Sequence, residues 1–201
     1  MKGGVPRERK PRADSVRNRE RLFSAAKAAF AELGPSASLE EIARRAEVGI
    51  GTLYRHFPTR DALVEAVYRR EVEQLGAAAD RVLAEYEPGE ALRQWLLVFI
   101  DYLAAKKVMA GALNALVAGP SALYASSGNV IRAAIGKLLQ RGKDTGDVRA
   151  DIETADIMQA LAGLAYNYGN PGWKRSALRL VDIIVAGLRP DAATRPSRAR
   201  R

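Results

Sequence analysis

The segment from Ser38 to Phe57, SLEEIARRAEVGIGTLYRHF, constrains the fold of this chain more than any other stretch. Ser38 and Glu41 have the spacing of a capping box, in which the serine hydroxyl accepts from the Glu41 amide and the glutamate carboxylate accepts from the Ser38 amide. A helix is therefore predicted to begin at Leu39. Its apolar face consists of Leu39, Ile42, Ala43 and Ala46.

A second short helix is predicted after a break in the pattern at residues 47–49. Leu53 and Phe57 are one turn apart and are expected to face inward. The outward face holds Ile50, Gly51, Thr52, Arg55 and His56, with Tyr54 at its edge. Two short helices joined by a tight turn, the second with a polar and basic outer face, form the helix-turn-helix that lays its second helix in the major groove. An ordinary helical hairpin fits the same pattern, and the pattern alone leaves both open.

The residue identities favour the helix-turn-helix. The run IARRAEVGIGTLYRHFPTRDAL closely resembles the DNA-binding signature of the TetR family of bacterial transcriptional repressors. The matching positions are Gly51, Thr52, Leu53, Tyr54, His56 and Phe57, with Arg60 in the basic position that follows. This resemblance, which is specific over residues 38–64, implies an all-α fold with an N-terminal three-helix head on a C-terminal helical bundle.

Two positions depart from the family pattern. Glu47 stands where family members usually have glycine, at a turn position that often needs a left-handed backbone. We therefore expect either strain at Glu47 or a shift of the turn toward Gly49. Gly49 itself stands where a serine or threonine often caps the recognition helix, so the chain lacks a phosphate-binding hydroxyl there.

Positive charge is concentrated near the two ends of the chain. The first 60 residues hold 13 Lys and Arg against 7 Asp and Glu, a net charge of +6. Residues 61–188 hold 14 against 15, a net charge of −1, and the remaining 13 residues carry a net charge of +4. A basic surface on the predicted helix-turn-helix is what binding to a polyanion needs.

The sequence supplies little for enzyme chemistry. It has no cysteine and its only histidine is His56, so a zinc site or a catalytic triad has no candidate residues. The glycines before Thr52 do not follow a predicted strand and are no dinucleotide fingerprint. The longest strongly apolar run, Trp95–Ile100, is too short to span a bilayer, and the N-terminus has no secretory signal. We expect a soluble, cytoplasmic protein that is not an enzyme and needs no cofactor or metal.

The remainder of the chain is predicted to be helical, with no convincing strand. The predicted helices span residues 17–33, 60–86, 90–106, 109–117, 130–141, 152–167 and 173–188, and Asp151 is the expected N-cap of the helix over 152–167. The predicted organisation is a disordered basic arm at 1–16, a DNA-binding domain at 17–60, an effector-binding and dimerisation domain at 61–188, and a disordered basic tail at 189–201.

Amides at the start of the recognition helix, at Ile50 and Gly51, are expected to bind a DNA phosphate. Arg55 is the longest donor on the exposed face and is the candidate for reading a base such as guanine, while Ile50 is placed to touch a thymine methyl. The resemblance implies phosphate contacts by Thr52, Tyr54, His56 and Arg60. The predicted DNA-binding residues are Arg17, Ser38, Arg45, Gly49, Ile50, Gly51, Thr52, Tyr54, Arg55, His56 and Arg60.

Other basic residues leave two interpretations open. Arg44 and Arg45 face outward from the first motif helix and suit either a solvated role or a phosphate contact. Arg17 and Arg21 are candidates for a phosphate near the helix over 17–33. The arm residues Arg7, Arg9, Lys10 and Arg12 suit either the DNA backbone or a solvated leader.

The family resemblance implies a small-molecule pocket in the C-terminal helices. The candidate lining, mixed apolar and polar as ligand sites usually are, is Trp95, Phe99, Tyr102, Met109, Asn114, Met158, Tyr166 and Asn167. Plain core packing explains each of these residues equally simply.

The resemblance also implies a homodimer through the last two helices, 152–167 and 173–188, because a palindromic operator needs two heads in one particle. The same apolar stripes would serve a monomer core.

The function expected is thus a repressor that leaves double-stranded operator DNA when a small molecule binds. One alternative is a helix-turn-helix protein that activates or organises DNA without an effector. Another is a helical ligand-binding or enzymatic bundle whose basic face is incidental; it predicts no steep salt dependence of DNA affinity.

Overall fold

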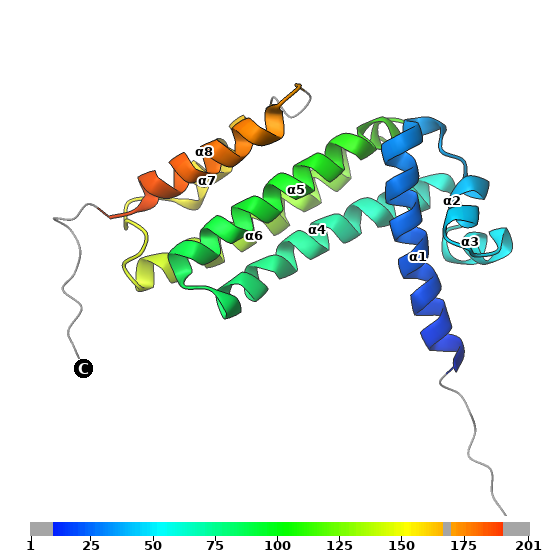
Figure 1. Ribbon diagram of the computed structural model, residues 1–201, viewed down its shortest axis with the longest axis horizontal. Coiled ribbons are helices and arrows are strands. Elements are labelled where there is room, and N and C mark those ends of the chain that lie inside the picture. Colours follow the sequence, from blue (N-terminus) through cyan, green and yellow to red (C-terminus); the bar gives the residue numbers. More distant parts are fainter. Residues whose placement is uncertain (1–9, 167–169, 191–201) are drawn as a thin grey trace, which may run out of the picture. The chain divides into compact units, whose positions relative to one another are not determined.

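The computed structural model describes residues 10–166 and 170–190 of the chain. All regular secondary structure in these residues is helical (Figure 1). The helices are α1 (Lys10–Leu33), α2 (Leu39–Arg45), α3 (Ile50–His56), α4 (Arg60–Glu85), α5 (Pro88–Asn114), α6 (Ser121–Asp144), α7 (Thr154–Tyr166) and α8 (Trp173–Leu188), with a short 3₁₀ turn at Gly34–Ser36. The predicted all-α fold is confirmed. Within the described residues, no helix is both long and apolar enough to cross a membrane.

The chain divides into two compact units. Of the described residues, the first unit contains 10–68 and 108–120, and the second contains 69–107, 121–166 and 170–190. The long helices α4 and α5 each contribute one end to the first unit and the remainder to the second. The domain boundaries expected from the sequence, at residues 17, 61 and 189, remain predictions.

The first unit is built around α1, against which α2 packs, with α3 packed on α2. Its core is formed by apolar side chains that the sequence pattern placed inward. Among the most buried are Leu22, Phe30, Ile42, Leu53 and Leu63. Two further contacts tie the end of α5 to this core: the Val117 amide donates to the Asp61 carboxylate (3.1 Å), and Gly111 lies against the ring of Pro35. A Cβ at Gly111 would come within 2.9 Å of that ring, so glycine permits the close approach.

The second unit has an aromatic core. Trp95 is fully buried, its indole N–H donates to the Leu75 carbonyl (3.0 Å), and its ring stacks on Phe99 at 5.8 Å. Ion pairs join its helices at the surface, among them Arg93 with Asp182. The buried indole has a hydrogen-bond partner, as a polar group in an apolar interior requires.

The limits of four helices, α1, α5, α6 and α7, correct the sequence predictions. Helix α1 begins at Lys10 and not at Arg17, so the predicted disorder of residues 1–16 is wrong from Lys10 on; Arg17 pairs with Asp14 one turn earlier, which supports that turn. Residues 1–9 lie outside the described residues, as does the tail beyond residue 190. Helix α5 is continuous from Pro88 to Asn114, joining two predicted helices, because nothing between residues 106 and 109 breaks it.

Helix α6 begins at Ser121, nine residues before the predicted start. Residues 121–129 are rich in Ala, Ser and Gly, so the sequence did not indicate their buried face, which includes Leu123 and Ser127. The hydroxyls of Ser126 and Ser127 donate to carbonyls three residues earlier, so these serines remain satisfied inside the helix.

Helix α7 begins at Thr154, and Asp151 is not its cap. The Asp151 carboxylate is held by Arg149 through two hydrogen bonds of 2.8 and 2.6 Å. The Asp156 carboxylate accepts from the Glu153 amide instead. Asp151 stands three residues before the first residue of α7, too early in the chain to be its N-cap.

Candidate nucleic-acid interface

Helix α3 presents one face to the core of the first unit and the other to solvent. Leu53 and Phe57 are buried, and the Phe57 ring lies 5.6 Å from the ring of Phe23 on α1. The exposed face consists of Ile50, Gly51, Tyr54 and Arg55, with Thr52 and His56 half-buried at its edges. Burial confirms the predicted anchors Leu53 and Phe57, but it exchanges the places of Tyr54, which was expected at the edge, and of Thr52 and His56, which were expected on the outward face.

Only one of the two hydrogen bonds of the predicted capping box is present at the start of α2. The Ser38 hydroxyl accepts from the Glu41 amide (3.1 Å), and the helix begins at Leu39 as predicted. The Glu41 carboxylate does not close the box: it accepts from Arg44 (2.9 and 2.7 Å) and Arg45 (2.6 Å). Arginines one turn further along the helix offer charged donors, which bind a carboxylate more strongly than an amide does.

The turn between α2 and α3 has a left-handed residue at Glu47, whose φ is +50°. The Glu47 amide donates to the Arg44 carbonyl (3.0 Å) and the Val48 amide to the Ala43 carbonyl (3.0 Å). This pair of hydrogen bonds is the Schellman motif, which places its left-handed residue at the position occupied here by Glu47. The strain expected at Glu47 is thus present, and the turn has not shifted to Gly49, which caps α3 in an extended conformation.

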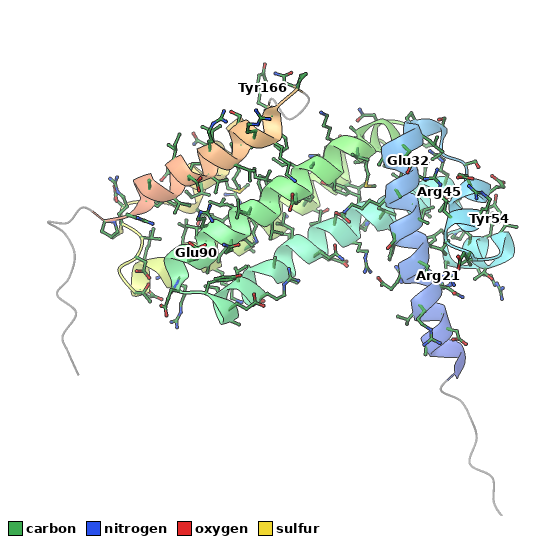
Figure 2. The ribbon with its side chains drawn as sticks, viewed as in Figure 1. Arg21, Glu32, Arg45, Tyr54, Glu90 and Tyr166 are labelled. Atoms are coloured by element: carbon green, nitrogen blue, oxygen red, sulfur yellow. The ribbon has the colours of Figure 1, made fainter. Side chains whose placement is uncertain are left out.

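Two carboxylates and two arginines form a network between α1 and α2, of which Figure 2 labels Glu32 and Arg45. Arg45 joins Glu41 (2.6 Å) to Glu32 on α1 (2.8 Å), and its side chain is only 23% exposed. Hydrogen bonds from Arg44 and Arg45 lower the pKa of the Glu41 carboxyl to about 2. The hydrogen bonds that Arg45 donates to the carboxylates of Glu41 and Glu32 raise the pKa of Arg45. Arg45, a predicted DNA contact, therefore joins two helices of the free protein.

Arg60 also has partners inside the first unit. Its guanidinium donates to the Ala37 carbonyl and to the Pro35 carbonyl (2.7 Å), and it lies over the Phe30 ring at 5.4 Å. These contacts hold the segment between α1 and α2 against the start of α4. The structure thus gives Arg60 a positioning role that the sequence did not suggest, because its partners lie at least 23 residues away along the chain.

The candidate base reader, Arg55, is folded back on its own helix. Its Nε donates to the Gly51 carbonyl (3.2 Å) and a terminal nitrogen donates to the Thr52 hydroxyl (2.9 Å). Both contacts are solvent-exposed, so the guanidinium can exchange them for another acceptor. Arg17, another predicted contact, pairs with Asp14 in the first turns of α1 at the surface.

One contact in this region joins α1 to the turn. Arg21 donates to the Glu47 carboxylate (2.5 Å) and to the Glu47 carbonyl (3.3 Å). A second arginine of α1, Arg19, lies over the rings of Phe23 and Phe57 at 5.3 and 5.8 Å. Sequence reasoning proposed Arg21 only as a phosphate contact and missed Arg19. No local sequence pattern indicates either contact, because each depends on how α1 crosses the helix-turn-helix formed by α2 and α3.

The predicted effector residues do not gather in one compact unit. Trp95, Phe99 and Tyr102 form a buried aromatic row in the second unit, with ring centroids 5.8 Å apart along the row. Met158 is half-buried, Tyr166 is 86% exposed, and Asn167 lies outside the described residues. Met109 and Asn114 belong to the first unit, where Met109 is buried and Asn114 exposed.

Two hollows of the second unit involve other residues. One, of about 250 Å³, lies between the start of α5, the α6–α7 connection and the end of α8. The other, of about 280 Å³, lies beside the turn before α8 and is lined by Leu164, Trp173 and Leu180 among others. Neither contains a predicted effector residue.

The described residues contain no cluster of three or more histidines and carboxylates arranged to hold a metal ion. The arrangement that remains is a short exposed helix, anchored by two apolar side chains and flanked by arginines. It suits contact with a polyanion rather than catalysis.

Comparison with known proteins agrees with this geometry. Residues 22–67 match the family model described as bacterial regulatory proteins, tetR family, and residues 87–190 match that of the transcriptional regulator SbtR-like, C-terminal domain. Among proteins of known sequence, the chain is similar to the HTH-type transcriptional regulator UidR of Escherichia coli K12, with 28% identity over 167 residues, 74% of this chain and 78% of UidR.

Two solved structures are more similar. The TetR transcriptional regulator SCO0520 from Streptomyces coelicolor is 46% identical with a TM-score of 0.77, and the match covers 87% of this chain and 99% of that one. A TetR transcription regulatory protein from Mycobacterium vanbaalenii is 36% identical with a TM-score of 0.72, over 89% and 99% of the two chains. The chain therefore belongs to the TetR family and is a DNA-binding transcriptional regulator.

Proposed function

We propose that this regulator binds a palindromic operator as a homodimer and is released when a small molecule binds its C-terminal helices. The observation that carries the proposal is the exposed face of α3, which Leu53 and Phe57 anchor from behind. A recognition helix supported in this way can enter the major groove without rearrangement of the core. DNA is its partner in the cytoplasm.

Arg55 is the proposed base reader. Its present acceptors, the Gly51 carbonyl and the Thr52 hydroxyl, lie on α3 itself, so the guanidinium is already held over the exposed face. Exchange of these acceptors for N7 and O6 of guanine would give a bidentate contact. Thr52, Tyr54 and His56 would then contact phosphates and fix the register.

The test of base reading compares R55A with the wild type on a panel of duplexes. Loss of a bidentate contact, about 1–3 kcal/mol, should weaken binding by about 5- to 150-fold on duplexes with the read guanine, and far less on others. Y54F and H56A should weaken all duplexes alike. Uniform weakening by R55A, or a changed sequence preference in Y54F, would contradict these assignments.

Dimerisation is proposed through α7 and α8. Helix α8 buries Ala177, Val181, Val185 and Leu188 but leaves Ile183 65% and Leu180 41% exposed on another face. Exposed apolar side chains on one helix flank are typical of an interface between subunits. Replacing Ile183 by Glu should convert a dimer to a monomer in sedimentation velocity, whereas Arg81→Glu, at an exposed position of α4 outside the proposed interface, should not. A wild type that sediments as a monomer would overturn the proposal.

Effector release is proposed from the family, in which ligand binding is typical. The buried aromatic row of Trp95, Phe99 and Tyr102 offers the apolar surface that a small molecule would need on opening of the bundle. A gel shift on the region upstream of its own gene, with and without a ligand library, tests it. Release of DNA by one compound supports the proposal, and ligand-independent binding favours a regulator without an effector.

A further inference from the structure

The α2–α3 turn carries a carboxylate beside the recognition helix, and an arginine of α1 is bound to it. Glu47 lies three residues before Ile50, the first residue of α3. Its side chain is 83% exposed and that of Arg21 is 43% exposed, so the pair lies at the surface. The pair borders an open hollow of about 410 Å³, lined also by Glu20, Ser24, Ala25, Arg45 and Ala46.

The geometry of this contact resembles the way an arginine holds a phosphate. One terminal nitrogen of the Arg21 guanidinium donates to two oxygens of Glu47, a carboxylate oxygen at 2.5 Å and the backbone carbonyl at 3.3 Å. Phosphate and carboxylate oxygens are both anionic acceptors for a guanidinium N–H. In the free protein, Glu47 thus supplies Arg21 with the anionic acceptor that a DNA phosphate would otherwise supply.

The turn holds Glu47 in place for this contact. Its left-handed backbone is fixed by the two hydrogen bonds of the Schellman motif, which direct its carbonyl toward Arg21. Arg44 and Arg45 are occupied by Glu41 and Glu32, and therefore do not compete for Glu47.

We propose that Glu47 acts as an internal substitute for a DNA phosphate, which holds Arg21 and thereby lowers the affinity and the salt dependence of duplex binding. The proposal rests on DNA binding by the head formed by α1, α2 and α3, and not on base reading or on an effector. While Glu47 holds it, Arg21 releases no counterion from DNA. Removal of the carboxylate makes Arg21 available for one more phosphate contact.

The experiment measures the dissociation constant of the full chain for a fluorescent duplex of arbitrary sequence between 50 and 200 mM salt. In E47Q, and in E47G, whose turn needs no strained residue, log K should fall more steeply with log salt than in the wild type, by about 0.9 for one added phosphate. The affinity gain over wild type should be about 3- to 4-fold larger at 50 mM than at 200 mM salt.

A double-mutant cycle separates a phosphate contact from a general change of charge. In the E47Q background, R21A should make the fall of log K with log salt less steep by about 0.9. In the wild-type background, R21A should leave this slope unchanged. The matched control is E40Q, which removes an exposed carboxylate from the first turn of α2 and should leave the slope at the wild-type value.

The proposal is overturned if both E47Q and E47G keep the wild-type slope. It is also overturned if R21A lowers the slope equally in the two backgrounds, or if E40Q steepens it as much as E47Q does. Circular dichroism melts of each variant confirm that the head is folded under the binding conditions. Because the duplex has arbitrary sequence, failure of base reading or effector release would leave this result untouched.

Discussion

The contacts of Arg60 allow the effect of its removal to be worked out in advance. Its guanidinium donates to the carbonyls of Pro35 and Ala37 and lies 5.4 Å from the centroid of the Phe30 ring. A hydrogen bond from a charged donor contributes about 1.5–3 kcal/mol, less where it is exposed, as the one to Pro35 is. A cation above a ring at a partly exposed site adds about 0.5–1 kcal/mol.

We therefore expect R60A to lower the free energy of unfolding by about 2–3 kcal/mol, since the two contributions are not fully additive. The assay is urea denaturation of the full chain followed by circular dichroism at 222 nm. R60K keeps the charge but cannot span two carbonyls with a fork, so it should recover no more than about half of the loss. The matched control is R81A, which removes an exposed arginine further along α4 and should change the free energy by less than about 0.5 kcal/mol.

The same variants decide between the two roles of Arg60. A positioning role predicts that R60A, at a temperature where it remains folded, binds duplex DNA with the wild-type salt slope. A phosphate contact, the role implied by the family resemblance, predicts a slope smaller by about 0.9. A loss of stability below about 0.5 kcal/mol in R60A, or R60K as stable as wild type, would refute the positioning argument.

Three further predictions concern stability. S38A removes the acceptor for the Glu41 amide and should lower the free energy of unfolding by about 1 kcal/mol, measured by thermal melting, with S38D retaining most of it. The pKa of Glu41 is lowered from 4.5 to about 2, so the stability it contributes is present above pH 4.5 and is lost as the pH falls toward 2. The difference in urea midpoint between wild type and E41Q should accordingly shrink over that range, and a constant difference would contradict the assignment. W95F leaves the Leu75 carbonyl without its indole donor and opens a small cavity, so it should lose about 1–3 kcal/mol, whereas W173F, at a half-buried site, should lose less.

The parts of the fold that the sequence predicted are those set by neighbours along the chain. The start of α2 at Leu39 follows from Ser38, whose hydroxyl accepts a hydrogen bond from the amide of Glu41, three residues later. The inward positions of Leu53 and Phe57 follow from their spacing of one turn. The limits of α8 at Trp173 and Leu188 follow from the glycine before it and the proline after it.

The errors occurred where a local signal was weak or had competition. Serines and glycines in residues 121–129 suggested a loop, but the hydroxyls of Ser126 and Ser127 are satisfied within α6 and its inward side chains are buried. Asp151, the expected N-cap of α7, instead accepts two hydrogen bonds from Arg149. The first error came from the composition of a short segment, and the second from a helix that begins three residues after the expected cap.

The sequence by itself determined the helical fold, the helix-turn-helix and the membership of a regulator family, because periodicity, caps and the recognition motif act over one or two helical turns. Only the tertiary structure decided what the arginines of the head do. Arg21 meets Glu47 across 26 residues of chain and Arg60 meets Ala37 across 23. A long guanidinium side chain can reach many acceptors, and the one it binds is chosen by how the helices cross, which no local pattern encodes.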